Sequence, residues 1–548
     1  WTISGHAKQL GFNPINNAPG LHDFSGVFAI DNKGGTFRFI NSKPQLDWPV
    51  SLGKPISSTI DGALIWWKSG TDWVLAARDL HWQGEGLDIT VDSQLQMYQS
   101  GKAPMLNLAA NLKTFDFTTA KRFWLRHLMN ESTIQWLDMA IVKGEIRNAS
   151  VLLSGNLDHW PFADKTGRFS ARTVLFAEQF KFAGDWPAAQ NTLLNVDFNG
   201  PGFSADGSLI YLDNPITLLP SGIASFSTSD LIIDVSASSN MQTLLPVLNK
   251  TPLKATVGDL VAGLKGNGPV VANVNMLFPL SKGSEYNRSQ GDITFIGTDI
   301  QSKDLNLAMS KVTGLAKFDN DGFSAANLQA RMDKNPVKFG IRVGNKHVKN
   351  NVNHIEADLK GEFNSEYLLK FDPALNYLNS VLKGKSPWLF LVNVPVAKNA
   401  ATAPVYLRAQ SDLVGTVLNL PVPLNKTLLE AKAFELNTQL PSDKSPIEFK
   451  IGPDFRLLLN MPKDKPMSGI ALFGNKTQGA IPVNGFSVRG NVDEFDVPAW
   501  ISLAGKSTGD GGLQSFDLLV NHLRLLGSDF GTTRLLLKPD PKALIMRA

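Results

Sequence analysis

The 548-residue chain contains no cysteine. A fold held together by disulfides and a metal site built from thiolates are therefore both excluded. This composition fits an exported envelope protein, and it fits a protein of a reducing compartment equally well.

Charge and long apolar runs are also scarce. Charged residues make up only 19% of the chain, and the net charge of +4 is not gathered into a basic stripe. Because nucleic-acid-binding proteins concentrate Lys and Arg on one surface, we predict no nucleic-acid partner. No apolar stretch approaches the ~18 residues that a membrane helix needs.

Recognisable catalytic and metal-binding motifs are missing as well. Residues 505–509 match a nucleophile elbow in letters only, because no strand precedes them and no helix follows. Residues 319–322 resemble part of a calcium loop, but its first and twelfth ligand positions would be Lys317 and Leu328. The eight His residues are scattered. We therefore predict no catalytic residue, no metal site and no cofactor.

What the sequence does contain is alternation of apolar and polar residues. Val337, Phe339 and Ile341 alternate with Lys338 and Arg342. Successive side chains of a strand point to opposite faces, so this pattern predicts a strand with one buried face. Turn sequences rich in Asp, Asn and Gly separate such segments, at 31–35, 199–202 and 319–322. They favour hairpins, and hence a mostly β, antiparallel architecture.

Short helical patterns interrupt the strands at a regular interval, beginning near Thr119, Asn240, Asp372 and Asp496. Such a period indicates one structural unit used about four times. The predicted units are residues 1–118, a β unit; 119–239, a helix pair with a β unit; 240–371 and 372–495, two further β units; and 496–548, the start of another. No linker divides them, so we expect the chain to be elongated, with a radius of gyration well above the ~24 Å of a compact domain of this length.

Two of these units can be overlaid on each other. Residues 198–205 read Phe-Asn-Gly-Pro-Gly-Phe-Ser-Ala and are followed by Asn214 and Pro215. Residues 318–325 read Phe-Asp-Asn-Asp-Gly-Phe-Ser-Ala, and they are followed by Asn-Pro at 335–336. The repeated turn and its matching Asn-Pro predict a true internal repeat.

The string WLDMAIVKGEIRNASVLLSGNLDHWPF at 136–162 resembles the central region of the YhdP family, large AsmA-like proteins of the Gram-negative envelope. Residues 185–187, the turn at 318–325 and residues 384–388 are similar to that family too. The similarity extends over nearly the whole chain, without the family's N-terminal membrane anchor or its C-terminal portion.

This resemblance implies both an architecture and a role. The expected fold is an elongated, twisted antiparallel β-sheet curled into an open trough, with short helices between the units. The expected role is a conduit that carries phospholipids between inner and outer membranes, with no enzymatic activity. The segment would be periplasmic, in an inner-membrane-anchored protein of a Gram-negative bacterium, and would reach both membranes through other parts of its parent protein.

The more apolar side of each strand is predicted to line the trough. The predicted lipid-binding residues are Val151, Leu153, Leu231, Ile233, Val235, Val274, Met276, Phe278, Val337, Phe339, Ile341, Phe449 and Ile451.

Two other classes of function stay open at this point. A structural or glycan-binding β-repeat protein would show the same alternation, and Trp66, Trp67, Trp73 and Trp82 could form a sugar platform. A glycan hydrolase could use carboxylates that no motif reveals. Lipid that co-purifies with the chain would separate the conduit from both.

Overall fold

The computed structural model shows a chain that is mostly β, with 66% of residues in strands and 10% in helices. It describes residues 1–15, 19–52, 54–122, 131–225, 227, 230–254, 263–279, 288–302, 307–370, 379–396, 404–463, 465–474, 478–504, 512–525, 528–539 and 544–547. The chain divides into two compact units, Trp1–Ile293 and Thr294–Ala548, each of which is described by itself. The division falls within β19 (Arg288–Ser302).

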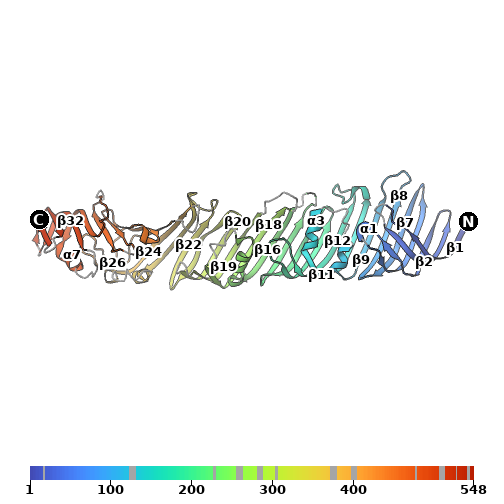
Figure 1. Cartoon of the computed structure of the whole chain (residues 1–548), viewed down its shortest axis with the longest axis horizontal. Helices are drawn as coiled ribbons and strands as arrows, with labels where there is room; N and C mark the ends of the chain where they lie inside the picture. Colours follow the sequence, from blue (N-terminus) through green and yellow to red (C-terminus); the bar gives the residue numbers. More distant parts are fainter. Residues whose placement is uncertain are drawn as a thin grey trace. The chain divides into compact units, whose positions relative to one another are not determined.

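In the first unit, antiparallel strands pair almost in chain order, as Figure 1 shows in blue to green. The order is β1, β2, β3, β6, β7, β8, β9, β11, β12, β13, β14, β15, β16 and β18. Among the described residues, no pairing joins β1 to β18, so the sheet stays open. The strands are β1 (Thr2–Phe12), β2 (Gly20–Asp31), β3 (Gly34–Ser42), β4 (Gln45–Asp47), β5 (Ile56–Ser57), β6 (Thr59–Ser69), β7 (Asp72–Gly84), β8 (Leu87–Met97), β9 (Met105–Leu112), β10 (Phe115–Asp116), β11 (Ile141–Asn156), β12 (Arg168–Phe180), β13 (Ala189–Asn199), β14 (Gly202–Tyr211), β15 (Asn214–Ile223), β16 (Asp230–Asn240), β17 (Leu264–Asn267) and β18 (Pro269–Pro279).

The second unit is built in the same way up to its last part. Its antiparallel order is β20, β21, β22, β23, β24, β25, β27, β28, β29 and β30. The strands are β20 (Leu307–Asp319), β21 (Gly322–Met332), β22 (Asn335–Val343), β23 (Asn353–Asn364), β24 (Leu382–Pro395), β25 (Val405–Ser411), β26 (Thr416–Leu418), β27 (Phe434–Leu440), β28 (Ile447–Ile451), β29 (Phe455–Asn460), β30 (Ser468–Phe473), β31 (Gly485–Asp496), β32 (Leu513–Leu525), β33 (Ser528–Asp529), β34 (Thr533–Pro539) and β35 (Leu544–Arg547).

The mostly β, antiparallel architecture predicted from the sequence is confirmed, but strands near the C-terminal end of this unit also pair in parallel. β31 pairs in parallel with both β30 and β32. A parallel pair needs a long connection that returns the chain to the starting edge, and helices commonly supply it. Here α7 (Val497–Ala504) lies between β31 and β32 in the chain. The turn signals in the sequence did not reveal this crossover.

Helices begin close to three of the four predicted positions, which confirms those predictions. α2 (Phe117–Arg122) starts after Asp116, whose Oδ1 accepts a hydrogen bond from the Thr119 amide at 2.9 Å. α4 (Met241–Lys250) is capped by Asn240, whose Oδ1 accepts from the Gln242 amide at 2.9 Å. At α7, Asp496 Oδ1 accepts from the Ala499 amide at 3.0 Å. Such side-chain acceptors satisfy amides that lack a partner in the first helical turn.

The helix expected to begin at Asp372 lies outside the described residues at its start, and Leu382 already belongs to β24. Other helices among the described residues are α1 (Pro49–Leu52), α3 (Glu131–Ala140), α6 (Ser365–Leu369) and the 3-10 turns η2 (Leu157–His159) and η5 (Ser442–Lys444). The division into five sequence units stays a prediction.

The internal repeat appears in the strand register of both units. In the first, Phe198 faces Phe203 and Ile210 faces Pro215. In the second, the equivalent pairs are Phe318 with Phe323 and Arg331 with Pro336. The same turn residues therefore build the same three-stranded arrangement twice, because the turn type and the alternation together determine the register.

Candidate lipid-binding face

Six of the predicted lipid-binding residues form three facing pairs on neighbouring strands of the first unit. β16 and β18 place Leu231 opposite Phe278, Ile233 opposite Met276, and Val235 opposite Val274. Side chains of directly opposed residues lie on the same face of a sheet. In each unit, we call the side of the sheet that carries the predicted lipid-binding residues its apolar face, and the opposite side its polar face.

Burial differs along this set. Leu231, Ile233, Met276 and Phe278 are buried in the main apolar cluster of the first unit, whereas Val235 and Val274 pack against it half-buried. The cover comes from the connection between β12 and β13. Its Phe182 and Trp186 rings lie 6.3 and 6.2 Å from the ring of Phe278. Side chains from this connection therefore close over the apolar face at β18.

One further contact holds that connection in place. The Trp136 indole on α3 donates a hydrogen bond to the Phe182 carbonyl at 2.8 Å. Tyr211, also in the cluster, lies 5.9 Å from Phe182 between ring centres, and burial raises the pKa of its hydroxyl. The Tyr211 hydroxyl has no hydrogen-bond partner among the described residues.

Val151 and Leu153 lie on β11, and both are half-buried. Their strand neighbours are small or apolar: Val151 faces Ala110 on β9 and Ala171 on β12, and Leu153 faces Leu108 and Phe169. Leu152, which points the other way, is 49% exposed. The predicted face is therefore the less exposed face of this strand.

In the second unit, Val337, Phe339 and Ile341 share one face of β22. Val337 is 3% exposed, while Phe339 and Ile341 are half-buried. Phe339 has Leu328 and Leu359 as its facing neighbours.

Phe449 and Ile451 on β28 are also half-buried. They face Leu436 and Phe434 on β27, and Leu457 and Phe455 on β29. The apolar face of the second unit thus continues across these strands, with partly exposed rather than fully buried side chains.

Polar groups pair with one another on the opposite side of each sheet. In the first unit, Arg172 donates to Asp197 at 2.8 Å, and Asn275 donates to Asp234 at 2.6 Å. In the second, the Arg342 guanidinium lies 3.0 Å from Asp358. Each sheet is therefore two-sided, as the alternation predicts.

One part of the apolar face that the sequence did not predict lies on β24. Trp388 and Phe390 stack at 5.9 Å, and Trp388 meets Phe434 edge-on at 5.3 Å. Residues 387–392 read Pro-Trp-Leu-Phe-Leu-Val, so no polar residue marks which side faces inward. The aromatic content predicts a strand here but not its orientation.

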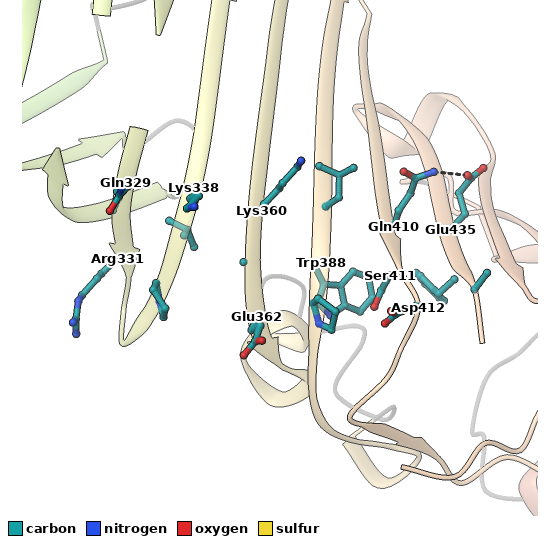
Figure 2. Close-up of a pocket in the computed structure, with 18 of the residues that line it drawn as sticks. Gln329, Arg331, Lys338, Lys360, Glu362, Trp388, Gln410, Ser411, Asp412 and Glu435 are labelled. Atoms are coloured by element: carbon teal, nitrogen blue, oxygen red, sulfur yellow. Dashed lines mark hydrogen bonds between the residues drawn. The ribbon is translucent and has the colours of Figure 1, made fainter. Parts of the chain in front are cut away.

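Hollows lined mainly by residues of the polar face occur in the described part of both units. One in the second unit has a volume of about 1340 Å³ and contains Gln329, Lys338, Lys360, Gln410 and Glu435 in its lining (Figure 2). One in the first unit, of about 650 Å³, is lined by residues that include Trp67, Asp92 and Leu152. Among the described residues, no group of three His, Asp or Glu side chains could hold a metal ion.

Comparison with known proteins identifies the relatives of this two-sided sheet. The family model described as YhdP protein matches residues 1–547. The chain belongs to the YhdP family. A similar protein within this family is the intermembrane phospholipid transporter YhdP of Escherichia coli (strain K12), which is 23% identical over 433 residues.

That match covers 78% of this chain but 33% of the relative, so the chain spans about a third of the length of that YhdP protein. No solved structure matches the chain. Within the described residues, no helix combines the length and the apolar character required to cross a membrane.

Proposed function

We propose that this chain is a section of a phospholipid conduit, and that acyl chains move along its apolar face between the inner and outer membranes of a Gram-negative envelope. The observation that carries the proposal is the apolar face itself, which continues from strand to strand within each unit while polar groups pair on the other side. Membership of the YhdP family and the name of the E. coli relative support the same role.

The energetics explain why such a face is useful. Transfer of the tails of a diacyl lipid with ~30 methylenes into water costs on the order of 20 kcal/mol of free energy, at ~0.8 kcal/mol per methylene. An apolar track removes most of this barrier without a nucleophile, a metal or a nucleotide. The segment would then lie in the periplasm, and other parts of its parent protein would contact the membranes.

Half-buried positions are the best candidates for lipid contact. Phe339, Ile341, Phe449 and Ile451 are partly exposed on the apolar face, whereas Leu231 and Phe278 are already covered by protein. We therefore place the lipid path over the partly exposed positions first. At the covered positions, side chains such as Trp186 would have to move before a lipid could reach the sheet.

Photo-crosslinking tests the proposal directly. A photoreactive amino acid at Phe339 in bacteria should yield phospholipid adducts, which mass spectrometry of the purified chain would identify. The same amino acid at Lys338, which neighbours Phe339 but points to the opposite face, should yield few. Equal labelling at the two positions, or none at Phe339, would refute a lipid path on this face.

A further inference from the structure

Two lysines on the polar face of the second unit oppose each other without a neutralising carboxylate. Lys338 on β22 faces Lys360 on β23, both are exposed, and both line the larger hollow. Within the described residues, neither ammonium group forms an ion pair. Arg331 lines the same hollow and has no ion-pair partner among the described residues, whereas two carboxylates of the lining, Glu362 and Glu435, pair with Lys385 and Lys450.

Like charges that face each other across a strand pair are destabilising. A second pair of facing cations in this unit has carboxylates beside it. Lys450 and Arg456 also face each other, on β28 and β29. There, Glu448 lies 3.3 Å from Lys450 and 3.9 Å from Arg456, and Glu435 lies 3.3 Å from Lys450, so two carboxylates balance the two cations. The Lys338 and Lys360 pair has no such carboxylate among the described residues, so an anion from outside would stabilise it.

The neighbours of the two lysines add hydrogen-bonding groups. Gln329 faces Lys338, Leu389 faces Lys360, and Gln410 faces Leu389. We call these five residues the cationic row: Gln329, Lys338, Lys360, Leu389 and Gln410.

Gln410 keeps an acceptor available. Its Nε2 donates to Glu435 at 2.9 Å (Figure 2), and its carbonyl oxygen accepts no hydrogen bond from the described residues. An amide side chain therefore lies near each end of the row, with two cations and one apolar residue between them. Side-chain amides can both donate to and accept from peptide groups.

We propose that the cationic row is the docking site for an acidic polypeptide segment of a partner protein. Carboxylates of the segment would neutralise Lys338 and Lys360, its backbone would bond to the two glutamines, and an apolar side chain would contact Leu389. The hollow of about 1340 Å³ is far larger than a small anion such as phosphate requires, and this favours an extended segment. The site lies on the face opposite the proposed lipid path, so the docking proposal does not depend on lipid transport.

The test is a binding titration with the whole 548-residue chain. The probe is a fluorescein-labelled peptide of the sequence Gly-Ala-Glu-Ala-Glu-Ala-Leu-Ala-Gly, whose two Glu side chains and Leu side chain share one face when it is extended. Its binding is followed by fluorescence anisotropy at low salt. Lys338→Glu should weaken binding by roughly tenfold, because it replaces an attraction by a repulsion at the rim of an interface. Lys317→Glu is the matched control, since Lys317 is exposed on β20 outside the hollow and the charge change is the same.

Thermal unfolding distinguishes docking from a structural role. Lys338→Glu places opposite charges across β22 and β23, so its melting temperature should be equal to or above that of the wild type. A fall in melting temperature together with weaker binding would overturn the proposal, because it would mean that Lys338 supports the fold.

Two other results would also overturn it. Equal weakening by Lys338→Glu and Lys317→Glu would show that only the net charge matters. Binding of heparin or of phosphatidylglycerol vesicles that depends on Lys338, without binding of the peptide, would assign the row to another kind of anion.

Discussion

Replacement of Phe339 by Asp places a charge on the proposed lipid path at a position where the fold should tolerate it. Phe339 is half-buried between Leu328 and Leu359 of the neighbouring strands. A carboxylate at this position would keep contact with water on its open side. The sheet is held mainly by backbone pairing of β22 with β21 and β23, which the substitution leaves in place.

Phe339→Asp should lower both the unfolding free energy and the affinity for lipid. Truncation of a fully buried Phe costs about 3–5 kcal/mol, so a half-buried one should cost roughly 2 kcal/mol of unfolding free energy. If the charge keeps about three lipid methylenes off the surface, lipid binding loses about 2 kcal/mol at ~0.8 kcal/mol each. That is a roughly 30-fold lower lipid occupancy.

Ile233→Asp provides the contrast. Ile233 is 9% exposed and faces Met276 inside the main cluster of the first unit. An unpaired charge in such a place adds to the loss of apolar burial, so we expect at least about 4 kcal/mol of destabilisation. Lys317→Asp on the polar face is the control for both variants and should change neither stability nor lipid content.

The assay combines urea unfolding with mass spectrometry of lipid extracted from each purified variant. Two results would refute the reasoning. One is a Phe339→Asp chain that unfolds as easily as Ile233→Asp, because Phe339 would then belong to a dry core. The other is a Phe339→Asp chain that retains as much lipid as Lys317→Asp.

Three further predictions concern the fold. Gly490→Ala should cost more than about 2 kcal/mol of unfolding free energy, since a Cβ at this φ of +139° would lie 1.9 Å from the Phe473 carbonyl oxygen. The control Gly452→Ala adds a Cβ that meets nothing within 4 Å and should cost about 1 kcal/mol in the same urea titration. Asn214→Ala should cost about 2–4 kcal/mol in the same assay, because the buried Asn214 amide donates to three backbone carbonyls. Hydrogen bonds from Asn437 and Gln410 lower the pKa of Glu435 from 4.5 to about 2, so its contribution to stability should be present above pH 4.5 and be lost as the pH falls toward 2. The difference in unfolding free energy between wild type and Glu435→Gln should therefore be largest near pH 7 and vanish near pH 2.

Local signals in the sequence predicted the features that depend on a few neighbouring residues. Asn240 begins a helix because its side chain can accept from an amide two residues on, whatever the rest of the fold does. The turns at 199–202 and 319–322 produce equivalent hairpins for the same reason. The parallel pairing of β31 with β32 was not predictable in this way, because it depends on where the chain returns after α7.

The sequence by itself determined that strands such as β22 (Asn335–Val343) have one apolar and one polar side, because alternation follows from the geometry of an extended backbone. It could not determine how deeply each apolar side is buried. Ile233 and Phe339 occupy the same kind of position in their strands, yet Ile233 is buried and Phe339 is partly exposed. Tertiary structure decided this difference, since the connection that carries Trp186 covers the apolar cluster to which Ile233 belongs. Burial depends on contacts between residues far apart in the chain, and no local pattern encodes them.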